Sequence, residues 1–320
     1  MKLRVVAARV PGSRAAYRKA VELRVAASRR MFARLSYSTV PVSVAVRLVY
    51  QVLLGREPDP GGWADWVGRV EAGDITRVDL QHWVRGSEEF QTRPFSDRAL
   101  GPSIHAGRCQ FIRSLPPARR VVDLGGTHLA REEGSMVALG YPYPFDELVI
   151  VDLPADDRHA LYRGDDRRTA VTTRLGTVRY RYHSMVDLSG FADDSVDLIY
   201  SGQSFEHVTA DEGAVVLKEA LRILRPGGHL ALDTPNARVT RLQQEAFIDP
   251  DHKVEYTWPE LSSLLGHAGF EIERAQGLNW GGPAVAGGRF DLATVAGNSG
   301  LYDDLESCYI LAAVCRKPDG

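Results

Sequence analysis

The chain has 320 residues, of which 44% are hydrophobic and 25% are charged, and its formal net charge is −2. This composition is ordinary for a soluble globular protein, and the length is more than one hydrophobic core usually organises, so we expect two domains. No apolar stretch approaches the uninterrupted length of a membrane-spanning helix, so the sequence predicts none.

The charge is distributed unevenly along the chain. Residues 1–34 contain ten Lys or Arg and one acid, a formal charge of +9, which leaves −11 for the remaining residues. A basic segment on an acidic body indicates contact with anionic lipid or nucleic acid, or else a solvated helix. We expect residues 1–41 to form a basic helical arm that could make peripheral contact with a membrane. Arginines interrupt every apolar run near the start, so no signal peptide is predicted.

The three cysteines, Cys109, Cys308 and Cys315, form no CxxC pair. An odd number without metal-ligand spacing is typical of buried or free thiols in a reducing compartment. The cytoplasm, with a position at the inner membrane surface as an option, is therefore the expected location.

Residues 42–95 are expected to form a small helical module. Apolar residues recur there at helical spacing, and Trp63, Trp66 and Trp83 are expected to lie in its core. The run LLGREPDPGGWADW, followed by a GSEEF end, resembles the bacterial family of domains of unknown function called DUF4214. That family occurs in surface and glycan-related proteins, so the resemblance implies a docking or recognition module and assigns no chemistry.

From about residue 100 to residue 317, short β-rich runs alternate with helical periods. This pattern indicates an α/β domain with a mostly parallel sheet and helices on both faces. Capping boxes predict helix starts at Thr209 with Glu212 and at Thr257 with Glu260. The predicted strands are Arg120–Leu124, Leu148–Asp152, Arg179–His183, Val196–Ser201, His229–Thr234, Phe270–Gly277 and Ser307–Lys317.

Two strand ends carry residues suited to binding a nucleoside. The segment RRVVDLGGTHL places Asp123 before Gly125 and Gly126, where the absence of a Cβ lets the backbone approach a ligand. The segment LVIVDLPADD ends a strand at Asp152, whose carboxylate can accept hydrogen bonds from both ribose hydroxyls. The full GxGxxG motif that favours phosphate binding is absent, which points away from NAD.

Three further segments follow in order: MVDLSGFADDSVDLIYSGQSFEHV, EALRILRPGGHLALDTPN and DHKVEYTWPELSSLLGHAGFEIERAQG. Together with the first two, they resemble the class I S-adenosylmethionine-dependent methyltransferases, in particular the large group with an EHV signature. The resemblance covers about 200 residues. It implies a Rossmann-like seven-stranded sheet and S-adenosylmethionine as the cofactor.

The resemblance also implies site residues. At the position of the family's second glycine this chain has Thr127, and at the third it has Leu129, which keeps open a non-catalytic version of the fold. The residues expected around the cofactor are Asp123, Gly125 and Gly126 in the loop, Asp152 and Leu153 near the ribose, Ser184 and Met185 near the adenine, and Ser201 and Gln203 toward the methionine end.

Two histidines are candidates for a general base that removes a proton from an acceptor hydroxyl. His207 follows the fourth strand and His252 lies in the loop after the fifth, and either could instead be a structural histidine. Asp249, Asp251 and His252 could hold a metal, but hard cations need more oxygen ligands than this run supplies, so no metal is expected.

Residues 279–306 are rich in glycine and precede the last strand. Long loops in compact domains are usually functional or disordered, and we interpret this one as a cover over the acceptor site. Trp280 could stack on a sugar face, but an anchoring role is favoured.

These features predict an O-methyltransferase for a polar acceptor such as a sugar or cell-surface glycan. The alternatives are methylation of a lipid or quinone-type small molecule, and a non-catalytic cofactor-binding protein. A nucleic-acid substrate is disfavoured because the predicted catalytic domain is acidic. The sequence determines neither the acceptor nor the oligomeric state.

Overall fold

The computed structural model describes residues 40–50, 54, 57–87, 89, 96–128, 131–155, 157–158, 169–244, 247–249 and 251–319. The basic arm predicted at the start of the chain therefore lies outside the described residues, except for its last two. Among the described residues, no helix combines the length and the apolar character that are needed to cross a bilayer.

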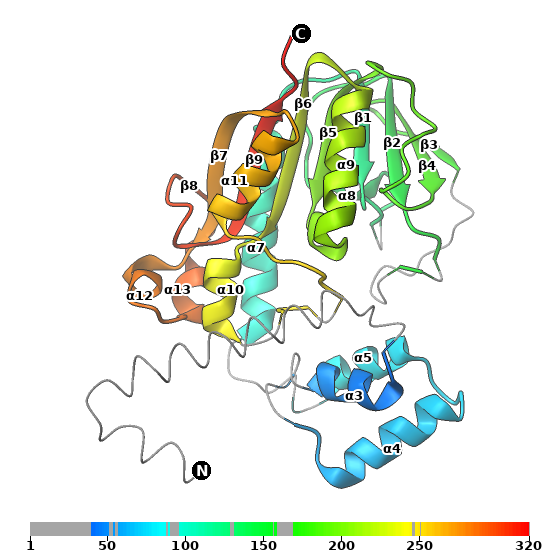
Figure 1. The fold of residues 1–320 in the computed structure, drawn as a ribbon, viewed down its shortest axis with the longest axis vertical. Coiled ribbons are helices and arrows are strands. Elements are labelled where there is room, and N and C mark those ends of the chain that lie inside the picture. Colours follow the sequence, from blue (N-terminus) through cyan, green and yellow to red (C-terminus); the bar gives the residue numbers. More distant parts are fainter. Residues whose placement is uncertain are drawn as a thin grey trace.

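Within its described residues, the predicted module contains the helices α3 (Val42–Val49), α4 (Pro60–Glu71) and α5 (Arg77–Gly86) (Figure 1). The helix α4 begins where the Asp59 carboxylate accepts a hydrogen bond from Gly62 N at 2.8 Å, with Pro60 in the first turn. Trp66 packs on the module's core and donates from Nε1 to Tyr50 Oη at 2.9 Å. The prediction for Trp83 was wrong: its side chain is 56% exposed and lies beside Arg69.

The larger domain contains one nine-stranded sheet in the order β3-β4-β2-β1-β5-β6-β9-β7-β8. All seven predicted strands are present. The two that the sequence did not reveal, β3 and β8, are short edge strands, too short to show a periodic pattern. The strands are β1 (Arg120–Leu124), β2 (Glu147–Asp152), β3 (Ala170–Thr172), β4 (Thr177–Tyr182), β5 (Val196–Gly202), β6 (Leu224–Pro235), β7 (Glu271–Trp280), β8 (Leu301–Tyr302) and β9 (Cys308–Arg316).

Five neighbouring strands, β4, β2, β1, β5 and β6, run parallel. The strand β9 runs the opposite way between β6 and β7, and it pairs with both. From β1 the chain builds outward to β2 and β4 on one side and to β5 and β6 on the other. The strand order thus reverses between β1 and β5, and in open α/β sheets such a switch point is where ligands bind.

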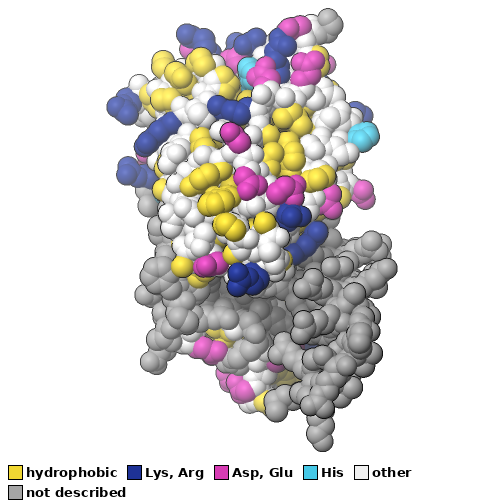
Figure 2. Space-filling view, turned by 90° about the vertical axis from the view of Figure 1, so that its left-hand side faces the viewer, with side chains coloured by type: hydrophobic (Ala, Val, Ile, Leu, Met, Phe, Trp, Pro, Cys, Tyr) yellow, Lys and Arg dark blue, Asp and Glu magenta, His cyan; other side chains and the backbone are white. Residues whose placement is uncertain are grey.

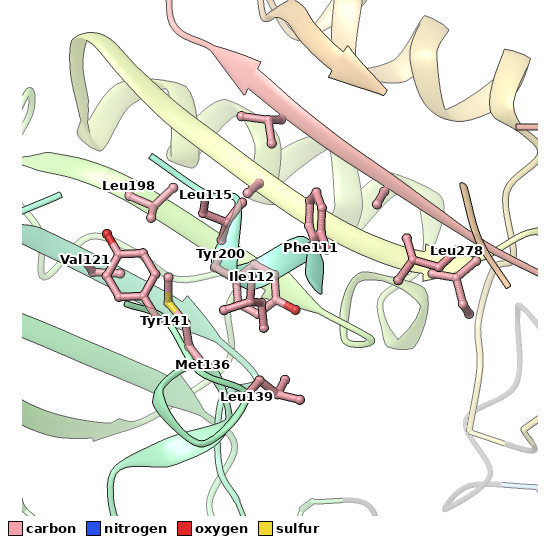
Figure 3. Close-up of a cluster of buried hydrophobic side chains, with 14 of the residues drawn as sticks. Phe111, Ile112, Leu115, Val121, Met136, Leu139, Tyr141, Leu198, Tyr200 and Leu278 are labelled. Carbon is pink, nitrogen blue, oxygen red and sulfur yellow. The ribbon is translucent and has the colours of Figure 1, made fainter. Parts of the chain in front are cut away.

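Alternate residues of each strand enter the two faces of the sheet, as the two-residue period of a strand requires. On one face Val121 packs with Phe111 and Ile112 of α7 (Figure 3). On the other face Val122 packs with α9 and α11, which lie in front of the sheet in Figure 1. The helices of this domain are α7 (Ser96–Arg113), α8 (Gly134–Ala138), α9 (Ala210–Ile223), α10 (Ala237–Gln243), α11 (Trp258–His267), α12 (Gly282–Ala286) and α13 (Leu292–Gly297), with a 3₁₀ turn η4 (Phe205–His207).

The glycine-rich segment after β7 is ordered, in contrast to the loop that the sequence suggested. It forms α12, α13 and β8, and Ser299 Oγ donates to the Ser103 carbonyl of α7 at 3.0 Å. Trp280 stacks on Tyr302 and donates from Nε1 to Asp304 Oδ2 at 2.9 Å, which supports the anchoring role. On the face of the molecule at this side, acidic and basic side chains are mixed among hydrophobic ones (Figure 2).

Candidate active site

The site begins at the loop that leaves β1, at the point where the strand order reverses. Gly125 N donates to the Val151 carbonyl of β2 at 2.8 Å, and Gly125 has a φ of 74°, in the left-handed region that favours glycine. A Cβ at this position would lie 2.6 Å from Ser204 Cβ. The loop therefore passes tightly between β2 and the segment that follows β5, and Gly125 is required for this path.

Asp123 lies beneath this loop. Its carboxylate is 1% exposed and accepts a hydrogen bond from Met136 N, in α8, at 3.3 Å. Burial raises the pKa of Asp123 to about 8, although the hydrogen bond from Met136 and the charge of Arg108 oppose the shift. A Cβ on Gly126 would lie 2.1 Å from Asp123 Oδ2. Asp123 thus supports the loop from inside the domain.

Gly134 was not recognised from the sequence as part of the site. Without a Cβ, its backbone can approach β2 closely, which a residue with a side chain, such as Thr127, could not do. Gly134 has a φ of 81°, and a Cβ there would lie 2.2 Å from Ile150 Cδ1 of β2. The next residue, Ser135, donates from its N to the Gly126 carbonyl at 2.7 Å. A glycine at the first position of a short helix was the available signal. Leu129, the other departure from the family pattern, lies outside the described residues.

Asp152 ends β2 beside this loop. Its Oδ2 accepts from Thr127 N at 3.1 Å, its Oδ1 accepts from Leu153 N at 2.8 Å, and Arg158 Nε lies 3.8 Å from Oδ1. Leu153 is 37% exposed, one of the few large apolar side chains of the described residues that face solvent. A carboxylate beside an exposed apolar side chain fits a nucleoside, which presents ribose hydroxyls and an apolar ring.

The segment after β4 borders the same loop. The Met185 Cε would lie 3.9 Å from a Cβ on Gly125, so this thioether is next to the glycine turn. Ser184 Oγ accepts from Val186 N at 3.3 Å and caps its own turn. Met185 is therefore available to pack on a ligand, whereas the Ser184 hydroxyl is engaged locally.

Beyond β5, the chain is fixed by a buried hydrogen-bond network. Ser201 Oγ and Ser204 Oγ are 2.7 Å apart, and Ser204 Oγ donates to the Leu124 carbonyl at 2.7 Å. Gln203 is a non-glycine residue with a φ of 53°, a conformation that is concentrated at functional sites. Its Nε2 donates to Asp233 Oδ1 at 2.9 Å.

Asp233, at the end of β6, is fully buried and joins three elements. Arg108 Nε of α7 lies 2.8 Å from Asp233 Oδ1, and Tyr200 Oη of β5 donates to the other carboxylate oxygen. A Cβ at Gly202 would collide with both Tyr200 Oη and Arg108 Nη2. Sequence analysis missed this group because Arg108 precedes Asp233 by more than a hundred residues and no motif contains both.

A second buried polar cluster contains both histidines predicted from the sequence. Their rings are 4.9 Å apart, edge to face. His252 Nδ1 lies 3.0 Å from Glu255 Oε1, and His252 Nε2 lies 3.9 Å from Glu206 Oε1. His207 Nδ1 lies 3.3 Å from the Asp251 carbonyl oxygen. Glu206 was visible in the EHV signature, but nothing in the sequence placed Glu255 beside His252.

The charges in this cluster are shaped by burial. Burial raises the pKa of Glu206 to about 7, and the charge of His252 and the hydrogen bond from Thr234 only partly oppose this. Burial alone would lower the pKa of His252, but the hydrogen bond to Glu255 and the nearby carboxylates outweigh it and raise the pKa to about 9. Near neutral pH, His252 is therefore protonated on both ring nitrogens and is poorly suited to accept a proton from an acceptor.

Comparison with known proteins gives matches in both parts of the chain. Residues 148–232 match the family described as a methyltransferase domain, and residues 30–94 match the domain of unknown function DUF4214. A probable S-adenosylmethionine-dependent methyltransferase of Mycolicibacterium smegmatis is 33% identical over 108 residues, which are 34% of this chain and 41% of the relative. One from Mycobacterium tuberculosis is 37% identical over 78 residues, which are 24% of this chain and 28% of the relative.

The chain thus spans less than half the length of these curated relatives. Among solved structures, it is similar to a SAM-dependent methyltransferase, possible histamine N-methyltransferase, of Thermotoga maritima. The TM-score is 0.46 and the identity 18%, over 68% of this chain and 91% of the other.

The fold and the sequence matches together define the class of the larger domain. The larger domain is similar to S-adenosylmethionine-dependent methyltransferases, and S-adenosylmethionine is the cofactor of that class. Within the larger domain the match to the methyltransferase-domain family covers residues 148–232, and the DUF4214 match covers most of the helical module. The predicted fold, cofactor and family resemblances are confirmed.

Proposed function

We propose that this protein transfers a methyl group from S-adenosylmethionine to a hydroxyl group of a polar acceptor, such as a sugar or a glycan. The observation that carries the proposal is the position of the polar cluster of Glu206, His207 and His252. Glu206 and His207 lie in η4, just after β5, and His252 lies between α10 and α11, so the cluster gathers residues that follow β5 and β6, two of the parallel strands. A hydroxyl acceptor needs its proton removed, and this cluster offers the groups for it.

The residues present fit the cofactor. Asp152 would accept hydrogen bonds from the ribose hydroxyls, and Leu153 and Met185 would pack against the adenine. The backbone at Gly125 and Gly126 would lie beside the methionine portion, because this loop leaves β1 at the point where the strand order reverses. When bound, the cofactor supplies an electrophilic methyl group on a sulfonium, whose bond breaks with its electron pair remaining on sulfur.

The protein's own groups would position the acceptor and handle its proton. Gln203 is held in its left-handed conformation by Asp233, so this backbone is fixed before the acceptor binds. His207 is half-buried and reaches the surface of the cluster, whereas His252 is 5% exposed. His207 is therefore the better placed of the two to meet a hydroxyl.

The sugar or glycan class of acceptor rests on the DUF4214 module, whose family occurs in surface and glycan-related proteins, and on the histidine cluster. The basic start of the chain would suit a site at the membrane surface, where cell-surface glycans are assembled. The alternative of a non-catalytic cofactor-binding protein rests on Thr127 and Leu129, and the turnover measurements below distinguish it from the enzyme.

Two measurements test this function. Calorimetric titration should show binding of S-adenosylmethionine, and a screen of methylated products in a deletion strain should reveal the acceptor. His207→Ala and His252→Ala are made separately. The variant that lacks the general base, expected to be His207→Ala, should lower turnover at least 100-fold, the usual range for loss of general-base chemistry, with little change in cofactor affinity. Cofactor binding without turnover on any hydroxyl compound would favour the non-catalytic alternative.

A further inference from the structure

The spacing of Glu206, His207 and His252 is unusual for a purely hydrogen-bonded cluster. One potential ligand atom from each side chain lies within 4.8 Å of the other two. The separation of 3.9 Å between Glu206 Oε1 and His252 Nε2 is too long for a hydrogen bond. Two donor atoms that each bind one metal ion at about 2.1 Å lie roughly 3–4 Å apart. This spacing fits a shared ion better than a direct contact.

Glu206 gives an independent indication that something binds here. Its side chain is 1% exposed, and Oε2 accepts a hydrogen bond from Thr234 Oγ1 at 3.0 Å. Its Oε1 is buried and has no hydrogen-bond partner in the part of the chain that the structure describes. Leaving a buried carboxylate oxygen unsatisfied is costly, so such an atom calls for a ligand, and a cation is the ligand that suits it.

Both imidazole rings are oriented for coordination. His252 Nδ1 faces the Glu255 carboxylate at 3.0 Å, and His207 Nδ1 faces the Asp251 carbonyl oxygen at 3.3 Å. Because both of these oxygens accept hydrogen bonds, each Nδ1 carries a proton, and a metal ion would bind at Nε2 in place of any second proton. Metal-binding histidines are typically held in this way by a carboxylate or a backbone carbonyl.

We propose that Glu206, His207 and His252 bind one divalent first-row transition metal ion, with Glu255 and the Asp251 carbonyl orienting the rings. One carboxylate and two imidazoles suit ions such as Zn²⁺, Fe²⁺ or Mn²⁺, whereas Mg²⁺ and Ca²⁺ prefer oxygen ligands alone. This set differs from the run of Asp249, Asp251 and His252 considered in the sequence, because the Asp251 carbonyl serves His207.

The inference deepens the proposed function, on which its catalytic meaning rests. His207 is half-buried, so coordination positions left open by the three side chains would be reachable from the acceptor side. With the ion bound, the two histidines are ligands rather than bases. An acceptor hydroxyl bound there would release its proton to water more readily, because a cation stabilises the resulting alkoxide oxygen. The site would thus favour acceptors that present a hydroxyl, or two neighbouring hydroxyls, to the ion.

Metal binding is tested on the full chain without a histidine tag, after treatment with a chelator and in the absence of S-adenosylmethionine. Titration with Co²⁺ and with Zn²⁺ should each show one equivalent bound, and bound Co²⁺ should acquire visible absorption, whereas Mg²⁺ should bind far more weakly. Glu206→Gln and His207→Ala should each weaken binding at least 10-fold, and Glu255→Gln should weaken it by about 10- to 100-fold.

His229→Ala is the matched control, since it removes a histidine that pairs with Glu273 at 3.1 Å, away from this cluster. Its metal binding should equal that of the unchanged chain. His207 is only half-buried, so His207→Ala should fold even where Glu206→Gln does not, and thermal unfolding verifies both. No binding, or binding that resists both substitutions, overturns the proposal.

A separate titration with S-adenosylmethionine distinguishes this proposal from the proposed function. Cofactor binding in a chain that binds no metal ion overturns the metal site alone. Metal binding in a chain that binds no cofactor overturns the methyltransferase function and leaves the metal site standing.

Discussion

Asp152 combines a predicted role with a structural one. Its carboxylate is predicted to bind the ribose, and in the structure it also accepts from Thr127 N and Leu153 N. The same side chain thus holds the glycine loop against β2. A substitution that keeps these local hydrogen bonds but lowers the charge would separate the two roles.

Asp152→Ala should therefore weaken S-adenosylmethionine binding, because each charge-assisted hydrogen bond contributes about 1.5–3 kcal/mol. A loss of at least 10-fold in affinity is expected by calorimetry. Asp152→Asn, which retains an acceptor oxygen, should lose less. Asp157→Ala, at a neighbouring exposed acid, is the control. Unchanged affinity in a folded Asp152→Ala variant would remove this residue from the cofactor site.

Asp123 makes a prediction about pH. Its folded-state pKa of about 8 is raised above the ordinary value of 3.8 by burial, so the folded protein holds this proton more tightly than the unfolded chain does. The associated stability is present at acid pH and is lost as the pH rises toward 8. The loss is on the order of 4 kcal/mol between pH 5 and pH 8, at about 1.36 kcal/mol per pH unit.

Asp123→Asn resembles the protonated acid and should lack this pH dependence. Urea unfolding from pH 5 to pH 9 should therefore show the free energy of unfolding falling more steeply in the unchanged chain than in Asp123→Asn. Asp303→Asn, at an exposed acid, should behave like the unchanged chain. Parallel curves for all three would show that Asp123 titrates normally.

At the scale of elements, the strands and helix starts were the most predictable features. The strand β1 has the predicted bounds, because a continuous apolar run ends there in a glycine turn. Both predicted capping boxes are present, at the starts of α9 and α11, because the capping residues and the helix they cap are only three positions apart.

Features that depend on contacts between distant elements were not predictable. A proline followed by two glycines, as in the run Arg225–Gly228, is typical of a helix end and a chain reversal, and α9 does end at Ile223. However, the run lies within β6 as a bulge, because Val196 pairs with Leu224 while Leu198 pairs with His229. The group of Arg108, Tyr200 and Asp233 was not predicted for the same reason, because its members come into contact only once the sheet has formed.

The junction of β7 and α7 depends on one such contact. Asn279 is fully buried with a φ of 60°, and its Nδ2 donates to Ser103 Oγ at 2.6 Å and to the Val295 carbonyl at 3.2 Å. It thereby joins α7, β7 and α13. Among ordinary residues, asparagine tolerates the left-handed conformation unusually well, and its side chain supplies the two donors.

Asn279→Ala should destabilise the domain by about 2–4 kcal/mol, because it removes both hydrogen bonds and places a Cβ in a left-handed conformation. Asn279→Gly removes the same hydrogen bonds without the backbone strain, so it should cost about 1 kcal/mol less than alanine. Chemical unfolding of the two variants measures the difference. Equal losses would show that the hydrogen bonds alone account for the effect.

At the scale of the whole molecule, the described residues form separate hydrophobic cores. The core of the helical module lies within residues 40–84, and the two cores of the sheet domain lie within residues 100–315. Each part buries its own apolar surface, which is the condition for independent folding. The role of the helical module in locating the enzyme or capturing the acceptor stays a proposal.

A chain of residues 96–319 should therefore be soluble and should bind S-adenosylmethionine with an affinity within about twofold of the full chain, since no predicted cofactor residue lies before residue 96. Size-exclusion chromatography and calorimetry provide the measurement, and the full chain is the reference. Aggregation of the shorter chain would show that the helical module completes the core of the sheet domain.

The position of β9 has a consequence for how the domain is synthesised. The strand β7 leaves the ribosome before β9, yet in the finished sheet β9 lies between β6 and β7 and pairs with both. Until residues 308–316 have emerged, the edge of β6 has no neighbour and β7 has no partner but the two-residue strand β8. An open strand edge invites association with other chains. The nascent chain is thus exposed to aggregation until β9 has paired with both strands.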